Sequence, residues 1–254
     1  MPAVQFSAVI ITFNEAHNIG RCLDSLAGVA DDLLVVDSFS TDETVAICRE
    51  KGARVVQHRF AGHIEQKNYA LEQALHPWIL SLDADEALSE TLRQSILAVK
   101  QNWRADGYSM NRRTNYCGQW INHSGWYPDR KLRLFDKRLG HWGGQNPHDK
   151  VIMNRGCRVD HLAGDLLHYS YYSVEEHVER VRRYAKMGAQ ALYNRGQKGS
   201  YWKMIFNPPF KFIRNYLLRR GFLDGRAGFT VCRIAALETF WKYRELLRLR
   251  ESKT

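Results

Sequence analysis

Three carboxylates lie almost side by side directly after an apolar stretch of the sequence. Asp83, Asp85 and Glu86 follow the segment 78–80, which reads Trp-Ile-Leu. Ionised carboxylates this close repel one another, and each favours protonation of the next, so we expect a positive partner. Magnesium usually binds one or two protein carboxylates together with substrate phosphates. The pattern favours a metal ion on Asp83 and Asp85 that neutralises a nucleoside diphosphate. A solvated turn that caps the next helix is the alternative.

The first hundred residues alternate between strand-like and helix-like segments. Apolar, β-branched runs predict strands, and apolar residues at helical spacing predict helices. The expected strands are 5–13, 33–37, 53–58 and 78–83, and the expected helices are 14–26, 40–52, 65–75 and 89–101. Asn14 stands where an N-cap belongs. Such alternation predicts an α/β fold with a Rossmann-related, doubly wound and mostly parallel sheet.

Polar residues follow three of these strands. Asn14 and Glu15 come after the first strand, Asp37 ends the second, and Asp83 ends the fourth. Ligands of open parallel sheets bind beyond the carboxyl ends of the strands, so we expect one pocket there. The first strand is followed by neither a glycine-rich dinucleotide fingerprint nor a phosphate-binding loop, so a dinucleotide cofactor is not expected.

The second part of the chain differs in charge and pattern. Up to residue 100 there are 8 Lys and Arg against 14 Asp and Glu, and afterwards 29 against 13. Strands are expected at 107–113 and 130–136, and a long helix at 173–196. We expect a catalytic domain over 1–200, with halves 1–100 and 101–200, and a basic, aromatic-rich helical region over 201–254. The basic part suits nucleic acid, an anionic membrane or a phosphorylated substrate.

Cysteines and hydropathy indicate the compartment. The five cysteines are scattered without close pairs, which argues against a disulfide framework or a zinc site and fits a reducing cytoplasm. We expect neither a signal peptide nor a membrane-spanning segment, because the N-terminal apolar run lacks a basic start and no apolar stretch is long enough.

Several motifs in combination resemble the family-two glycosyltransferases. They are VIITFNEAHNI, LLVVDSFSTDETVAI, QKNYAL and WILSLDADE, with looser matches in QNPHDKV and HYSYYSVEEHVERVRRYA. The resemblance implies a GT-A-like fold and a divalent cofactor, Mg²⁺ or Mn²⁺. More narrowly, the chain is similar to the bacterial lipopolysaccharide-core β-glucosyltransferases. That similarity implies inverting transfer of glucose from UDP-glucose to a heptose of the inner core. Another nucleotide-sugar donor or a lipid-phosphate acceptor is the alternative.

The resemblance also implies roles for residues of the first half. Asp37 would hydrogen-bond the uracil or ribose, and Thr12, Asn14 and Glu15 would line the same nucleotide site. Lys67 would approach the phosphates or ribose, or would simply be solvated. Asp83 would contact the ribose or metal-bound water. Asp85 would bind the metal, and His168 could complete the metal shell as an imidazole ligand or be a packed histidine.

In the second half the resemblance points to Asp149 as the base that takes the proton from the acceptor hydroxyl. The family often has His-Glu at this place, and here the pair is His-Asp. His148 could orient the carboxylate or the acceptor. Trp126 suits a sugar ring, with a core position as the alternative, and Arg130 and Arg133 suit a diphosphate or acceptor phosphate.

The segment from Tyr201 interleaves aromatic and basic side chains, which suits the headgroup region of an anionic bilayer. We therefore expect a cytoplasmic protein held peripherally on the inner face of the membrane, next to a lipopolysaccharide or lipid-linked acceptor. A helix packed on the catalytic domain is the alternative. A non-catalytic basic protein that binds membrane or nucleic acid is the alternative class, although no nucleic-acid partner is expected because the acidic first part would repel phosphate. The oligomeric state stays open.

Overall fold

The computed structural model describes residues 4–145 and 148–251. The chain forms two compact units. The first unit contains residues up to Arg112 and then 129–169, and the second contains 113–128 and the chain from Ser170 onward. The observed division therefore differs from the expected boundary at residue 200. The long helix before that boundary packs against the C-terminal helix and belongs with it.

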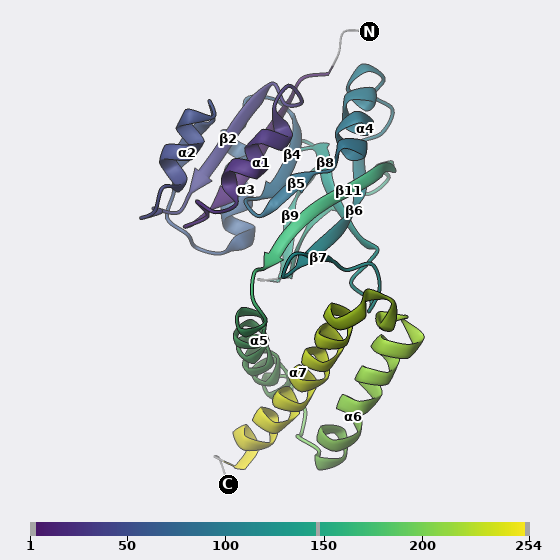
Figure 1. Ribbon diagram of the computed structural model, residues 1–254. Helices are drawn as coiled ribbons and strands as arrows, with labels where there is room; N and C mark the ends of the chain where they lie inside the picture. Colours follow the sequence, from purple (N-terminus) through teal and green to yellow (C-terminus); the bar gives the residue numbers. More distant parts are fainter. Residues whose placement is uncertain (1–3, 146–147, 252–254) are drawn as a thin grey trace. The chain divides into compact units, whose positions relative to one another are not determined.

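A mixed sheet forms the middle of the first unit, and its parallel strands lie together at one side of it (Figure 1). Its order is β3-β2-β1-β4-β8-β6-β11-β5, and β7 pairs with β6. The parallel strands are β1 (Phe6–Thr12), β2 (Asp32–Asp37), β3 (Arg54–Gln57) and β4 (Trp78–Asp83). The other strands are β5 (Glu86–Leu88), β6 (Gly107–Tyr116), β7 (Gln119–Trp120), β8 (Asp129–Asp136) and β11 (Val159–Tyr171). A separate antiparallel hairpin consists of β9 (Gly140–Gln145) and β10 (His148–Met153).

Both faces of the sheet are covered, because its strands direct apolar side chains to both sides. Helices α1 (Ile19–Leu26), α2 (Thr44–Glu50) and α4 (Glu90–Gln101) pack on one face, around strand residues such as Ala8 and Leu80. Helix α3 (His63–Gln73) and strand β9 pack on the other, around Val9 and Ile79. Strand neighbours in sequence point to opposite faces, so each parallel strand contributes to two apolar layers.

Local sequence signals explain where the helices begin. Ser89 and Ser173 accept hydrogen bonds from the backbone N–H three residues later, as N-cap serines do. Asn14 is not an N-cap, contrary to expectation. Helix α1 begins only at Ile19, and Asn14 adopts a left-handed backbone with φ of 53°. Asparagine tolerates this conformation better than most residues, so Asn14 forms part of a turn after β1.

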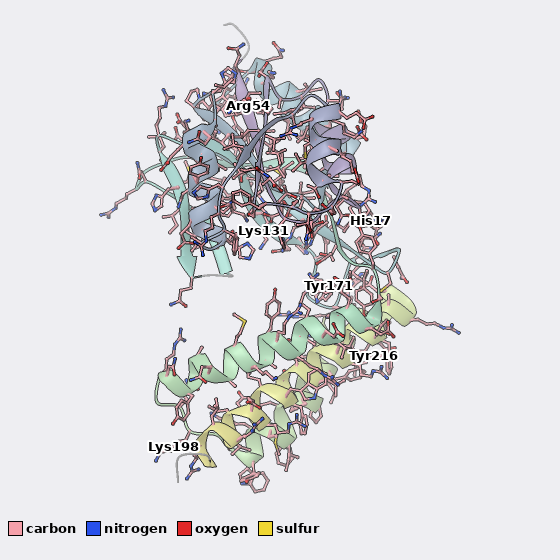
Figure 2. All side chains as sticks on the ribbon, turned by 90° about the vertical axis from the view of Figure 1, so that its left-hand side faces the viewer. His17, Arg54, Lys131, Tyr171, Lys198 and Tyr216 are labelled. Carbon is pink, nitrogen blue, oxygen red and sulfur yellow. The ribbon has the colours of Figure 1, made fainter. Side chains whose placement is uncertain are left out.

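The second unit is mostly helical, and it also includes β7 and the ends of β6 and β11. Its helices are α5 (Val174–Asn194), α6 (Tyr201–Ile213), the short π-helix η1 (Arg214–Leu218), the short 3-10 helix η2 (Gly221–Asp224) and α7 (Gly225–Glu251). Helix α7 packs against both α5 and α6. In Figure 2, Lys198 and Tyr216 mark opposite ends of this helical unit. Within the described residues, no helix has the length and apolar character that crossing a bilayer requires.

Candidate active site

The carboxyl ends of three parallel strands bring the predicted residues to one edge of the sheet. Thr12 of β1 is in register with Asp37 of β2, and Ile11 is in register with Asp83 of β4. Residues after these strands therefore lie next to one another even though they are far apart in the sequence. The predicted common edge is present.

The loops after β1 and β2 are bonded to each other. The Asn14 backbone N–H donates to Ser40 Oγ at 2.8 Å, and Asn14 Oδ1 accepts from the Thr41 backbone N–H at 2.8 Å. The Glu15 backbone N–H donates to Thr44 Oγ1 at 2.8 Å, and its carboxylate accepts from an amide side chain. Through these contacts Asn14 and Glu15 hold the two loops together. Their contact with a nucleotide stays a prediction.

Asp37 and Thr12 lie beneath these loops. Asp37 is fully buried, and its carboxylate accepts hydrogen bonds from the backbone N–H of Ser40 at 3.0 Å and from Gln57 Nε2 at 3.3 Å. The buried Thr12 hydroxyl has no hydrogen-bond partner among the described residues. A buried polar group without a partner is costly, so Thr12 Oγ1 is a position where a ligand or water would be stabilised.

Lys67 connects two of the predicted carboxylates. Its Nζ lies 2.8 Å from Asp83 Oδ1 and 2.7 Å from Asp149 Oδ2. The lysine side chain is 4% exposed, and its ammonium lies 4.3 Å from the centre of the Trp142 ring. The solvated alternative for Lys67 is therefore wrong. Helix α3 instead directs a buried cation between the end of β4 and the start of β10.

A second cation binds the same carboxylate cluster. Arg133 Nη2 lies 2.9 Å from Asp83 Oδ2 and 2.7 Å from Glu86 Oε1. The Glu86 carboxylate also accepts from the Asp83 backbone N–H at 3.0 Å and lies 3.4 Å from Arg112 Nη1. Burial alone would raise the pKa of Asp83, but the charges of Lys67 and Arg133 outweigh it and hold that pKa well below its usual range.

The positive partner expected for these carboxylates is thus present in the protein itself. Both oxygens of Asp83 are occupied by protein cations, so the side chain does not fit a metal ligand in this arrangement. Asp85 is different, because its Oδ2 lies 3.2 Å from His168 Nε2. Strand β11 places this histidine opposite Glu86 through the β5–β11 pairing. Nowhere in the described chain do three His, Cys, Asp or Glu side chains gather into a metal cluster.

Asp85 and His168 nevertheless fit a divalent ion that takes its remaining ligands from a substrate. A carboxylate and an imidazole in contact with each other can turn toward one ion, and magnesium sites commonly use only one or two protein carboxylates with substrate phosphates. Mn²⁺ accepts both donor types. The donor set therefore supports Asp85 and His168 and does not support Asp83.

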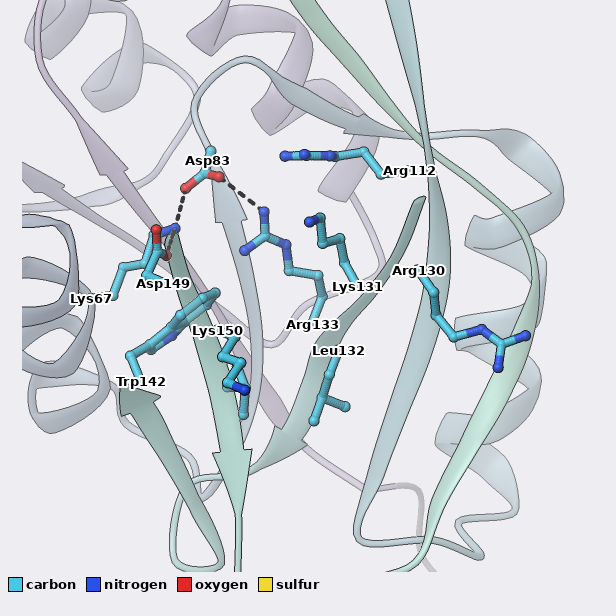
Figure 3. Close-up of a pocket in the computed structure, with 11 residues that line it drawn as sticks. Lys67, Asp83, Arg112, Arg130, Lys131, Leu132, Arg133, Trp142, Asp149 and Lys150 are labelled. Atoms are coloured by element: carbon cyan, nitrogen blue, oxygen red, sulfur yellow. Dashed lines mark hydrogen bonds and ion pairs between the residues drawn. The ribbon is translucent and has the colours of Figure 1, made fainter. Parts of the chain in front are cut away.

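A polar cavity of about 450 Å³ opens beside Lys67 and Asp83 (Figure 3). The side chains around it include two acids, Asp83 and Asp149, and a ring of six bases. The bases are Lys67, Arg112, Arg130, Lys131, Arg133 and Lys150. The Trp142 ring forms part of the wall, and Asn68 fixes its strand by bonding the Trp142 backbone N–H and carbonyl oxygen, each at 2.9 Å. An excess of cations around a cavity favours an anionic ligand such as a diphosphate.

Two predicted site residues are not among those that line this cavity: Trp126 lies in the second unit, and the His148 side chain is not described. Trp126 packs in the second unit, in an aromatic cluster with Tyr116, Tyr171 and His177. The core position considered for this tryptophan is therefore the one it occupies, and its contact with an acceptor stays a prediction. The side chain of His148 falls outside the described residues, although its backbone begins β10.

Sequence reasoning missed Arg112, Trp142 and Lys150, and gave Glu86 no role in the site. Glu86 was visible as the third charge of the carboxylate cluster. Arg112 was not distinguishable from its neighbour Arg113, because the register of β6 against β8 decides which of them faces the cavity. Trp142 lies on a short hairpin strand without an apolar pattern, so no periodicity identified it.

Comparison with known proteins gives consistent results. The model described as Glycosyl transferase family 2 matches residues 7–166. An uncharacterized glycosyltransferase of Rickettsia felis is 31% identical over 98% of this chain and 90% of its own length. The lipopolysaccharide core biosynthesis glycosyltransferase LpsC of Rhizobium meliloti is 29% identical over 94% of this chain and 91% of its own. The structure of S. aureus TarS 1–349 in complex with UDP-GlcNAc aligns over 99% of this chain and 93% of its own, with 15% identity and a TM-score of 0.48.

Proposed function

Because the chain belongs to glycosyltransferase family 2, we propose that the cavity beside Lys67 and Asp83 binds the nucleotide sugar. The family assignment and the GT-A-like fold agree with the sequence predictions. The observation that carries the proposal is the position of the cavity. It lies at the carboxyl end of β4, with six cations around it and one candidate base within it.

The proposed reaction is transfer of glucose from UDP-glucose to a heptose of the lipopolysaccharide inner core. Similarity to LpsC supports an acceptor in the lipopolysaccharide core. The bases around the cavity suit the diphosphate of the donor, and Arg130 and Lys131 among them suit an acceptor that carries phosphate. Another nucleotide-sugar donor, or a lipid-phosphate acceptor, is the alternative within the same class.

Asp149 is the proposed base. The Lys67 ammonium holds Asp149 Oδ2 at 2.7 Å and so leaves Oδ1 to accept the proton from the acceptor hydroxyl. That hydroxyl oxygen then attacks the anomeric carbon of glucose from the face opposite the diphosphate. The bond to the diphosphate breaks with its electron pair, and the anomeric configuration inverts. A positioned base contributes on the order of 10²–10⁴ to such a rate.

The other residues position the donor. Asp37 and the Thr12 hydroxyl lie at the ends of the adjacent strands, where the uridine is proposed to bind. Arg133, held by Asp83 and Glu86, is preorganised to face the diphosphate without moving. Asp85 and His168 are the residues that would hold a Mg²⁺ or Mn²⁺ ion. When bound, such an ion neutralises charge on the leaving diphosphate.

We propose that the protein works at the inner face of the cytoplasmic membrane, because an acceptor anchored in lipid is reached there. The test of the whole proposal is a transfer assay with a heptose-terminated core acceptor and a panel of UDP-glucose, UDP-galactose, UDP-GlcNAc and GDP-mannose. We expect hexose addition from UDP-glucose alone, and a β-glycosidic product by NMR. An α-linked product would contradict inversion. Transfer from another sugar nucleotide would replace the proposed donor.

A further inference from the structure

A second cavity, of about 380 Å³, lies within the second unit and away from the residues assigned to the reaction. It is lined by Asn122, His123, Gly125, Tyr127, Pro128 and Arg219. Several of these side chains can donate hydrogen bonds to an anion, among them His123 and Arg219, and no acidic residue lines the cavity. Its chemistry therefore differs from that of the first cavity, where two carboxylates face the cations.

A buried carboxylate fixes the histidine of this cavity. Asp224 is 3% exposed. Its Oδ1 lies 2.9 Å from His123 Nδ1 and accepts from the Asn122 backbone N–H at 3.1 Å, and its Oδ2 accepts from the His123 backbone N–H at 2.9 Å. With Nδ1 held in this way, Nε2 is the ring nitrogen available to a ligand. Three bonds to one buried carboxylate make this a preorganised site, not a histidine that rotates freely on the surface.

The arginine is fixed by close packing against a glycine. A Cβ at Gly125 would lie 2.1 Å from Arg219 Nη1 and 2.8 Å from its Cδ, and Gly125 has a φ of +79°. Any side chain at residue 125 would therefore displace the guanidinium. The Arg219 carbonyl oxygen also accepts from the Ser124 backbone N–H at 3.0 Å. The backbone of segment 122–125 thus holds the His123 and Arg219 side chains in place.

The chain that carries Arg219 also presents a continuous apolar stripe to solvent. The large side chains exposed along α6 and η1 include Trp202, Phe206, Phe210, Ile213, Leu217 and Leu218. Their spacing of three or four residues places the first five on one side of the helix, and the rings of Trp202 and Phe206 stack at 5.2 Å. Trp202 is 73% exposed and Leu218 is 74% exposed. A continuous apolar stripe on a solvent-exposed surface indicates an interaction site.

The charge of the stripe indicates its partner. Residues 201–223 contain five Lys or Arg and no Asp or Glu. The five are Lys203, Lys211, Arg214, Arg219 and Arg220. A second copy of the same face would bring two sets of these cations together, which disfavours a symmetric dimer through this stripe. Apolar and aromatic side chains flanked only by cations match an anionic bilayer, where the rings enter the headgroup boundary and the cations meet lipid phosphates.

We propose that α6, η1 and η2 form a docking surface for an anionic lipid bilayer, and that the cavity between His123 and Arg219 binds the phosphate of one lipid headgroup. The stripe from Trp202 to Leu218 enters the bilayer surface. The Arg219 guanidinium and the His123 Nε2 face the phosphate oxygens. This docking is independent of the donor and acceptor proposed above, since its residues all lie outside the catalytic cavity.

The test is co-sedimentation of the full chain with vesicles, made either of phosphatidylcholine alone or with phosphatidylglycerol added. We expect binding only to the vesicles that contain phosphatidylglycerol. The double variant Trp202→Ser, Phe206→Ser removes two rings of the stripe, and we expect its affinity to fall by at least tenfold. The matched control Leu75→Ser alters an exposed leucine of the first unit and should bind like the wild type.

A separate set of variants tests the cavity between His123 and Arg219. We expect Arg219→Gln and His123→Gln each to weaken binding to phosphatidylglycerol vesicles several-fold, whereas Arg195→Gln, an exposed arginine after α5, should have no more than a small effect. Short-chain phosphatidylglycerol should protect the wild type against thermal unfolding, and equal protection by inorganic phosphate would identify a free-phosphate site and overturn the lipid assignment. Equal binding to both vesicle types, or no vesicle binding together with self-association in ultracentrifugation, would overturn the docking surface. Circular dichroism of each variant distinguishes lost binding from lost folding.

Discussion

The ammonium of Lys67 lies 2.7 Å from the carboxylate of Asp149, a residue 82 positions further along the chain. The same ammonium lies 2.8 Å from Asp83. One buried cation thereby fixes the proposed base relative to the end of β4, where the donor is proposed to bind. This relationship links the two halves of the first unit and makes Lys67 a positioning residue for Asp149.

Replacing Lys67 with methionine should destabilise the protein. The substitution keeps the length of the side chain but leaves Asp83 and Asp149 without their shared cation. Breaking a buried ion pair by removing one partner costs about 3–5 kcal/mol, and because Arg133 still binds Asp83 we expect about 3 kcal/mol. Urea unfolding measures this change.

A matched pair of variants tests the cause of that loss. Lys150→Met removes an exposed lysine of the same cavity and should change the free energy of unfolding by no more than about 0.5 kcal/mol. The double variant Lys67→Met, Asp149→Asn should be more stable than Lys67→Met alone, because one unpaired charge is gone. Strictly additive effects in this cycle would show that the two side chains do not interact.

Asp149→Asn should abolish transfer and keep UDP binding. Asparagine is nearly the same size but cannot take the acceptor proton, so the rate should fall on the order of 10²–10⁴-fold. Turnover and UDP affinity are measured on the same preparation. Asp160→Asn, which alters an exposed ion pair with Arg158, serves as the control. Transfer at the wild-type rate by Asp149→Asn would exclude this residue as the base.

Asp85→Ala should remove metal-dependent nucleotide binding while the fold is retained. The aspartate lies in the turn between β4 and β5, and its side chain contacts His168 and contributes little to the core. Calorimetric titration with Mn²⁺ and UDP should show no manganese effect on UDP affinity in this variant. Asp24→Ala, at an exposed carboxylate paired with Lys51, should behave like the wild type. An unchanged manganese effect in Asp85→Ala would remove Asp85 from the metal site.

The sequence predicted the elements of the first hundred residues well, for physical reasons that are local. Apolar runs located β1 and β4, Ser89 marked the start of α4, and Gly52, with a φ of +77°, marked the end of α2. Asn14 failed as an N-cap because the chain makes an extra turn, bonded to Ser40, before the helix begins. That bond joins two loops, and helical periodicity carries no information about it.

The candidate site was predictable where strand ends or family motifs mark its residues. Asp37, Asp83 and Asp149 stand in recognisable motifs, whereas Arg112 enters the cavity through the β6–β8 pairing and Trp142 lies on the β9–β10 hairpin, where no motif marks it. The sequence did not predict that Lys67 and Arg133 would bind Asp83, where a metal ion was expected. Lys67 and Arg133 were both named as phosphate contacts, but their pairing with the carboxylate depends on the packing of α3 and β8 against β4, which sequence patterns do not specify.

Lowering the pH should destabilise the second unit through His177. Burial, and then the charge of Arg180, lower the pKa of His177 from 6.5 to about 4, and the ring bonds the Tyr116 hydroxyl at 3.1 Å. Above pH 6.5 both states are neutral and the full stability is present. Between pH 6.5 and about 4 the unfolded chain takes up a proton that the folded chain does not, so about 3 kcal/mol of stability is lost.

The variant His177→Gln isolates this contribution. It should be less stable than the wild type at pH 7.5 but should lose less additional stability as the pH falls to 4.5, and His63→Gln, at an exposed histidine, should keep the wild-type slope. Urea unfolding at several pH values, followed by near-UV circular dichroism, gives these slopes. Identical slopes for His177→Gln and the wild type would contradict the assignment of the pH dependence to this histidine.

The most direct test of the nucleotide site is thermal stabilisation by UDP, GDP, CDP and ADP, each with manganese or with a chelator. A ligand that binds only the folded state raises the melting temperature. We predict that UDP with manganese raises it, that the other three nucleotides have little effect, and that the chelator removes most of the UDP effect. Failure of every nucleotide to stabilise the protein, with or without manganese, would contradict the assignment of the cavity beside Lys67 and Asp83 to a UDP-sugar.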